Sequence, residues 1–208
     1  MIRALSLVLL LLLGGCAVRT LDRMKDLDAR GDWATLAATR LPACDGPRDA
    51  LCAEAHFLRA RGCTRLAATH LSETGRRDML DCALQSGRAA LAASDATEPA
   101  ERSAWRAAHA SALLASRQAR PAREACGDNA ELLEQSDLLR RETPNQPRPR
   151  FLAASARLTA ARCGAPPCPL LRDAAALLHD PPAEAAAQWR ALAAGIAITA
   201  RSLACPTP

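Results

Sequence analysis

Aromatic residues are scarce in this chain of 208 residues, since tyrosine is absent and two phenylalanines and three tryptophans make up 2% of the sequence. Proteins that bind single-stranded nucleic acids stack the bases on aromatic side chains, so this composition argues against a nucleic-acid partner. The ten glycines are too few for a fibrous protein. No segment alternates apolar and polar residues as a half-buried strand does. These absences leave a helical globular protein.

Signatures of catalysis and of cofactor binding are also missing. The sequence contains no Cys-x-x-Cys pair, no His-Glu-x-x-His helix, no Gly-x-Ser-x-Gly elbow, no glycine-rich phosphate loop and no dinucleotide fingerprint. A Cys-x-x-Cys-His site for covalent haem is absent too. We therefore expect a protein that is not an enzyme and that holds no cofactor.

The overall composition is that of one ordinary domain or two small ones. Half of the residues are apolar, 24% are charged and the formal net charge is +5. Every basic residue except Lys25 is an arginine. Because the chain is also rich in alanine, we interpret the arginines as a solvated face and not as a phosphate-binding patch.

The N-terminus has the layout of a signal peptide. Arg3 precedes an apolar run from Leu5 to Leu13, which is much shorter than the roughly 20 residues of a membrane-spanning helix. The run ends in Leu13-Gly14-Gly15-Cys16, which resembles the bacterial lipobox. The resemblance implies that residues 1–15 are removed and that Cys16 becomes an acylated (palmitate-bearing) N-terminus. Two or more acyl chains give stable membrane attachment.

The resemblance also implies a location. Ala17 follows the cysteine, whereas an aspartate there is the familiar inner-membrane retention signal, so we expect an outer-membrane anchor that faces the periplasm of a Gram-negative bacterium. An ordinary secreted protein is the alternative. Residues 16–31 would form an anchor-proximal tether or short helix, residues 32–205 a helical hairpin domain, and residues 206–208 a tail.

The body of the chain is predicted to be helical throughout. Alanine, leucine, arginine and glutamate have high helix propensity, and clusters of proline, glycine and aspartate divide the chain into segments. We expect helices over residues 21–30, 32–41, 47–71, 76–94, 99–120, 129–141, 150–163, 169–179 and 183–204. The connections are short, which predicts antiparallel helical hairpins.

Trp105, Phe151 and Trp189 each stand near the start of a predicted helix and are followed at +3, +4 and +7 by mostly small or apolar residues. This spacing places bulky and small residues on one face, so that the next helix can approach closely. It resembles the first helix of tetratricopeptide repeats, although the separations are unequal. The resemblance implies an all-α fold of antiparallel hairpins stacked as a short right-handed array. An unrelated disulfide-linked helical bundle is the alternative.

Nine cysteines occur in the sequence, and without Cys16 they form an even set in a compartment that oxidises thiols. Cys63 and Cys82 lie at similar distances from the predicted turn at residues 72–75, so facing helices bring them to the same height. Placing the other cysteines at the ends of stacked helices suggests three more pairs. These pairs are Cys126 with Cys163, Cys168 with Cys205, and Cys44 with Cys52, although eight cysteines permit 105 pairings.

One group of residues fits a metal site. Cys52, His56, Cys63 and His70 fall on one stripe of the third predicted helix. Met79 and Cys82 follow on the next helix, so copper or zinc would find soft ligands here. Disulfides together with partly exposed histidines are the alternative, because oxidation removes the thiolates that a metal needs.

Two functions follow from these patterns. The first is a non-enzymatic adaptor that is anchored to the membrane and binds a periplasmic or outer-membrane protein, serving an assembly or secretion machine. Its candidate partner-binding residues are Arg102, Arg106, His109 and Arg157. The second is a lipoprotein that handles metal ions or redox equivalents through His56, His70, Met79 and the nearby cysteines. The sequence leaves the oligomeric state open.

Overall fold

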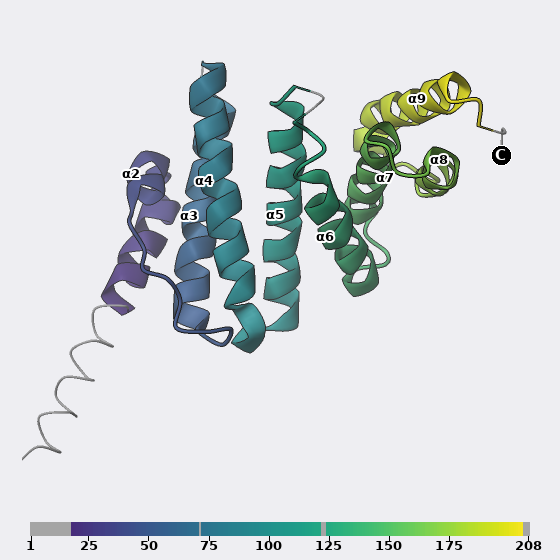
Figure 1. Cartoon of the computed structure of the whole chain (residues 1–208). Coiled ribbons are helices and arrows are strands. Elements are labelled where there is room, and N and C mark those ends of the chain that lie inside the picture. The colour runs from purple at the N-terminus through teal and green to yellow at the C-terminus, as the bar shows by residue number, and fades with distance from the viewer. Residues whose placement is uncertain (1–17, 71, 122–123, 206–208) are drawn as a thin grey trace, which may run out of the picture. The chain divides into compact units, whose positions relative to one another are not determined.

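The computed structural model describes residues 18–70, 72–121 and 124–205 (Figure 1). Within these residues the chain is all-helical and contains no strand, as the sequence predicts. A first helix spans residues 18–30. It is followed by α2 (Trp33–Ala38), α3 (Ala50–Thr69), α4 (Glu73–Ala92), η1 (Ser94–Ala96), α5 (Pro99–Gln118), α6 (Asn129–Glu142), α7 (Pro147–Arg162), α8 (Pro167–Ala176), η2 (Ala183–Ala185) and α9 (Ala186–Ser202). Whether these helices form a tetratricopeptide-like array stays a prediction.

Side-chain caps and prolines define where the helices begin. The carboxylates of Asp32 and Asp49 each accept a hydrogen bond of 3.1 Å from the backbone N–H three residues on, and the Ser72 hydroxyl does the same at 3.1 Å. These bonds satisfy N–H groups that have no partner within the helix. Pro99 and Pro147 stand at the first positions of α5 and α7, where a missing N–H costs nothing.

The structure differs from the predicted helices at residues 39–49. The sequence predicts helix up to residue 41 and again from residue 47, but α2 ends at Ala38 and α3 begins at Ala50. Pro42 and Pro47 lack a backbone N–H and disfavour helix at the preceding residue, and Asp49 caps α3. The result is a non-helical segment that runs along α3. We call residues 39–49 the 39–49 segment.

The chain forms two compact units, one up to His109 and one from Ala110, with the division inside α5. In the first unit, the 18–30 helix buries Leu21, Met24 and Leu27 against α2 and α3. A second cluster joins α3, α4 and α5 around Trp105, whose ring stacks on Phe57 with 5.0 Å between centroids and 14° between planes. The helix expected next to the anchor is thus part of a hydrophobic core.

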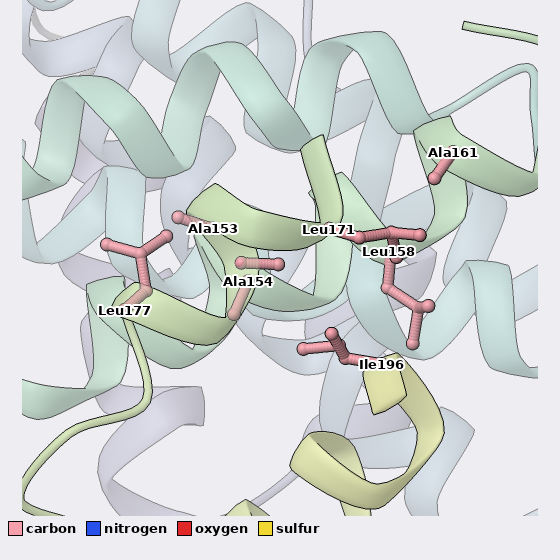
Figure 2. Packing of buried hydrophobic residues seen from close by; sticks show 8 residues of the cluster. Ala153, Ala154, Leu158, Ala161, Leu171, Leu177 and Ile196 are labelled. Atoms are coloured by element: carbon pink, nitrogen blue, oxygen red, sulfur yellow. The ribbon is translucent and has the colours of Figure 1, made fainter. Parts of the chain in front are cut away.

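The core of the second unit is built from α7, α8 and α9. Small residues of α7 let α8 and α9 approach, and the buried residues are Ala153, Ala154, Leu158, Ala161, Leu171, Ala174, Leu177 and Ile196 (Figure 2). The rings of Phe151 and Trp189 lie 6.0 Å apart and connect α7 to α9. Polar contacts add to this core, since Arg157 holds both carboxylate oxygens of Asp137 at 3.1 and 3.0 Å and so links α7 to α6.

Four disulfides close the structure, in the pairs that the sequence analysis suggests. Cys63 and Cys82 join α3 to α4, with 5.9 Å between their α-carbons. Cys44 and Cys52 attach the 39–49 segment to the first turn of α3, with 5.6 Å between α-carbons. Two further disulfides connect neighbouring helices. Cys126, just before α6, pairs with Cys163 at the end of α7, and Cys168 at the start of α8 pairs with Cys205 just after α9. For the three pairs that join helices, antiparallel packing brings the α-carbons within the range that a disulfide spans.

Candidate functional site

An open groove of about 570 Å³ lies in the first unit between the 39–49 segment, α3 and α4. Its volume falls in the range of known ligand-binding clefts. Most of its lining is apolar or small, and four polar side chains interrupt it. The lining residues are Leu41, Pro42, Ala43, Cys44, Gly46, Pro47, His56, Arg59, Gln85, Ser86, Ala89, Ala92 and Ala93.

The wall formed by the 39–49 segment is held at several points. The Cys44–Cys52 disulfide ties its middle to α3. Asp49 accepts a 3.3 Å hydrogen bond from the backbone N–H of Asp45, and Pro47 accepts one of 2.7 Å from the N–H of Asp95 in η1. A segment without helical hydrogen bonds is thereby kept in one conformation. The groove is preformed and needs no closure to exist.

Arg59 is the charged group of the groove. Its Nε donates to the Ala37 carbonyl and its Nη1 donates to the Ser86 hydroxyl, both at 3.1 Å. These bonds link α3 to α2 and α4 and fix the guanidinium. A guanidinium carries five N–H donors, and these two bonds use two of them. The others suit a carboxylate or a backbone carbonyl of a bound molecule.

His56 lies beside the Cys44–Cys52 disulfide and is 8% exposed. Its Nε2 lies 3.0 Å from the Pro42 carbonyl oxygen. A carbonyl can only accept, so Nε2 carries the proton and Nδ1 of the neutral ring presents a lone pair. Within the described residues Nδ1 is buried without a hydrogen-bond partner. A ring nitrogen of His56 and the sulfurs of Cys44 and Cys52 lie within 4.8 Å of one another.

The predicted metal stripe is divided between separate places. Cys52 and Cys63 belong to different disulfides. His70 is the exposed C-cap of α3, fourteen positions after His56, a distance of about 21 Å at the rise of an α-helix. Met79 is half-buried on α4. Residues on one helical face share a direction but not a height, so the stripe as a whole does not hold one metal ion.

The candidate partner-binding residues make intramolecular contacts. His109 is 4% exposed and packs against Gly87 of α4. Arg157 holds Asp137, as described above, and Arg102 lies 4.0 Å from a carboxylate oxygen of Asp95. Arg106 also has an interaction partner. These contacts give the residues a role in packing.

Sequence reasoning did not find Arg59, Gln85 or Ser86. They belong to no motif, and they come together because α3 packs against α4, while the 39–49 segment forms the other wall of the groove. The sequence did contain one signal, which is the break in the helical pattern next to Cys44. Pro42, Gly46 and Pro47 make this break. Cys16 and residues 206–208 lie outside the described residues.

Comparison with protein-family models, curated proteins and solved structures finds no similar chain. In the described part of the chain, no helix combines the length and the apolar character needed to cross a bilayer.

Proposed function

We propose that this protein is a non-enzymatic adaptor, anchored through Cys16 to the outer membrane and facing the periplasm, which binds a segment of another periplasmic or outer-membrane protein. The observation that carries this proposal is the preformed groove of about 570 Å³ next to a disulfide-held wall. A rigid site loses little conformational freedom on binding, which favours affinity for an extended segment.

The lining indicates what such a segment contains. Leu41, Pro47 and the alanines of α4 offer apolar contact for small or medium side chains. Arg59 and Gln85 supply donors for backbone carbonyls, and a carboxylate of the partner would pair with the guanidinium. The expected ligand is a short extended segment with apolar side chains and at least one acidic residue.

The helix that follows the lipobox in the sequence belongs to the same compact unit as the groove. The 18–30 helix follows the lipobox within the sequence and buries Leu21, Met24 and Leu27 in the core that includes α3. Acyl chains on Cys16 would therefore hold the groove near the membrane surface, where outer-membrane proteins present their periplasmic segments.

A photo-crosslinking amino acid at Gln85, an exposed groove residue, tests the adaptor proposal in cells. The same amino acid at Gln188, exposed on α9, is the control. We expect a discrete crosslinked partner from position 85 that is lost when Ala89→Trp fills the groove. A purified segment of that partner should then bind the wild-type chain and not the Ala89→Trp variant. Equal crosslinking from both positions, or crosslinking that survives Ala89→Trp, contradicts the proposal.

A second candidate function, metal or redox handling, is favoured by the arrangement at His56. Metal-bound histidines usually donate their other N–H to a carbonyl, as Nε2 does to Pro42, and leave the second nitrogen for the ion. The Cys44–Cys52 disulfide would first have to be reduced by a dithiol, which is itself oxidised to a disulfide. Each freed thiol then loses its proton to become a ligand for copper or zinc.

Mass spectrometry separates the two candidates. The protein is produced in an oxidising periplasm, measured under native conditions, and then alkylated without reduction. The adaptor proposal expects eight unalkylated cysteines after Cys16 and no bound ion. Two alkylated thiols at Cys44 and Cys52, with a copper or zinc ion that His56→Ala removes, would instead favour the metal function.

A further inference from the structure

A second cavity, of about 500 Å³, lies at the start of the described chain. It is bounded by the 18–30 helix, by α2 and by the two residues after α2. Its lining consists of Arg19, Thr20, Arg23, Met24, Thr35, Ala38, Thr39 and Arg40. Three of these residues are cationic and none is acidic, so the lining itself carries a net positive charge.

Among the described residues, the three arginines lack the ion pair that Lys25 and Arg61 make. Lys25 contacts Glu54 at 2.8 Å and Arg61 contacts Asp28 at 3.0 Å. No such pair is made by Arg19, Arg23 or Arg40 within the described residues, and all three are exposed. Their charge is thus available to a ligand.

The geometry suits a phosphate group. Arg19 and Arg23 are one helical turn apart, so their side chains leave the same face of the 18–30 helix. Arg40 lines the same cavity from the chain that follows α2. Thr39 already donates to the Thr35 carbonyl at 2.9 Å, which holds the end of α2 in place. Guanidinium groups bind phosphate oxygens with two parallel hydrogen bonds.

The position of the cavity indicates where this phosphate comes from. Arg19 follows Cys16 by three residues, and three residues of extended chain span at most about 11 Å. This reach is close to the screening length of about 8 Å at physiological ionic strength. An acyl anchor on Cys16 would therefore keep Arg19 close to the electrostatic field of the membrane surface, with Arg23 one helical turn further on.

We infer that Arg19, Arg23 and Arg40 form a binding site for the phosphate of an anionic phospholipid headgroup, which adds a second membrane contact to the acyl anchor. This inference rests on the lipid anchor of the proposed function and is independent of the groove. Basic residues next to an acyl chain strengthen attachment and orient the protein on the surface. The site would orient the first unit so that the same face always lies against the bilayer.

Vesicle binding tests the site without the acyl chains. The chain from residue 16 onward, with Cys16→Ser, keeps every residue that the structure describes. It is sedimented with vesicles of phosphatidylcholine alone, or with 30% phosphatidylglycerol. We expect binding to the anionic vesicles only. The triple variant Arg19→Gln, Arg23→Gln and Arg40→Gln should bind about 100-fold more weakly, at about fivefold for each arginine.

A second triple variant controls for net charge. Arg76→Gln, Arg190→Gln and Arg201→Gln remove the same charge from exposed positions outside the cavity. We expect this variant to bind anionic vesicles within about threefold of the parent chain, because distant surface charges are screened. Equal losses in the two triple variants would mean that net charge alone attracts the protein, and would overturn the site. Unchanged thermal unfolding of both variants excludes misfolding as the cause.

Inorganic phosphate distinguishes the two possible sources of the ligand. We expect phosphate to displace the protein from anionic vesicles more effectively than chloride at equal ionic strength. Saturable phosphate binding without any vesicle binding would overturn the membrane assignment. The vesicle assay uses a chain without acyl groups, so a failure of acylation in cells would not change its result. Loss of crosslinking at position 85 would count against the groove and not against the arginine site.

Discussion

Gly87 of α4 lies directly against the imidazole of His109 on α5, and a methyl group at Gly87 would overlap Nδ1 of that ring. Both residues are buried. The contact sets how closely α4 and α5 approach, because the ring takes the space where other residues carry a β-carbon. A glycine inside a helix is usually unfavourable, and here packing explains it.

Gly87→Ala is expected to destabilise the fold by about 1 to 3 kcal/mol, since a buried imidazole has little room to move aside. Gly195→Ala on α9 is the matched control. Its new methyl group would meet Leu158 at an ordinary 3.7 Å, so helix propensity should stabilise it by about 0.5 to 1 kcal/mol. Urea unfolding measures both. A Gly87→Ala variant as stable as Gly195→Ala contradicts the packing argument.

Double substitution isolates the contact between the two residues. His109→Ala alone leaves a cavity and lowers stability. If the imidazole is the obstacle, Gly87→Ala should cost much less in the His109→Ala background than in the wild-type chain. Additive effects would show that Gly87 matters for another reason.

The disulfides are expected to differ in what they stabilise. Replacing Cys63 and Cys82 with alanine should lower the free energy of unfolding by about 3 kcal/mol, since the bond closes a 19-residue separation and Cys63 is fully buried. Replacing Cys44 and Cys52 should mainly release the wall of the groove. We expect crosslinking from position 85 to fall in this second variant while far-ultraviolet circular dichroism stays the same. Loss of helix on removal of Cys44 and Cys52 would contradict this division.

Arg117 joins three helices of the second unit without a carboxylate partner of its own in the described contacts. It donates to Asn129 at 3.1 Å, to the Ser155 carbonyl at 3.0 Å, and to the Ser155 hydroxyl. Burial, and then repulsion from Arg162, lowers the pKa of Arg117 to about 10. Arg117→Gln should destabilise the protein by about 2 kcal/mol or more, because Asn129 and Ser155 lose a buried donor.

The lowered pKa of Arg117 also predicts a pH dependence. Between about pH 10 and the higher pKa of an ordinary arginine, the unfolded chain binds more protons at this group than the folded chain does, so stability rises with pH. Comparing the unfolding of the wild-type chain and Arg117→Gln at pH 9 and at pH 10.5 removes contributions that both share. The wild-type advantage should grow at the higher pH. A constant or shrinking difference would argue against the buried cation.

Asp32 predicts a second pH dependence at the acid end. Hydrogen bonds from Thr35, first from its backbone N–H, hold the pKa of Asp32 below its ordinary value. The stabilisation from a carboxyl with a lowered pKa is present above its ordinary range near pH 4 and is lost as the pH falls. Asp32→Ala should therefore lower the melting temperature at pH 6 and have a smaller effect at pH 2.5. An equal difference in melting temperature at pH 6 and at pH 2.5 would mean that the charge of Asp32 does not contribute to the stability of this cap.

Some features of this protein followed from local chemistry. Pro99 marks the start of α5 as predicted, because its missing N–H costs nothing at that position and depends only on near neighbours. Cys63 and Cys82 were paired because equal distances from a turn become equal heights on antiparallel helices. The helical class of the chain, most of its helix boundaries and its cysteine pairs were accessible for this reason.

Other features appeared only once the helices were packed. His56 and His70 share a helical face, yet about 21 Å of helix separates them, and His56 instead meets Cys44 from the 39–49 segment. Arg59 and Gln85 line one groove although they lie on different helices and in no motif. Helix formation depends on contacts a few residues apart, which a sequence displays directly. A binding surface depends on which distant segments meet, and here the packing of α3 against α4 and of the 39–49 segment beside them decided that.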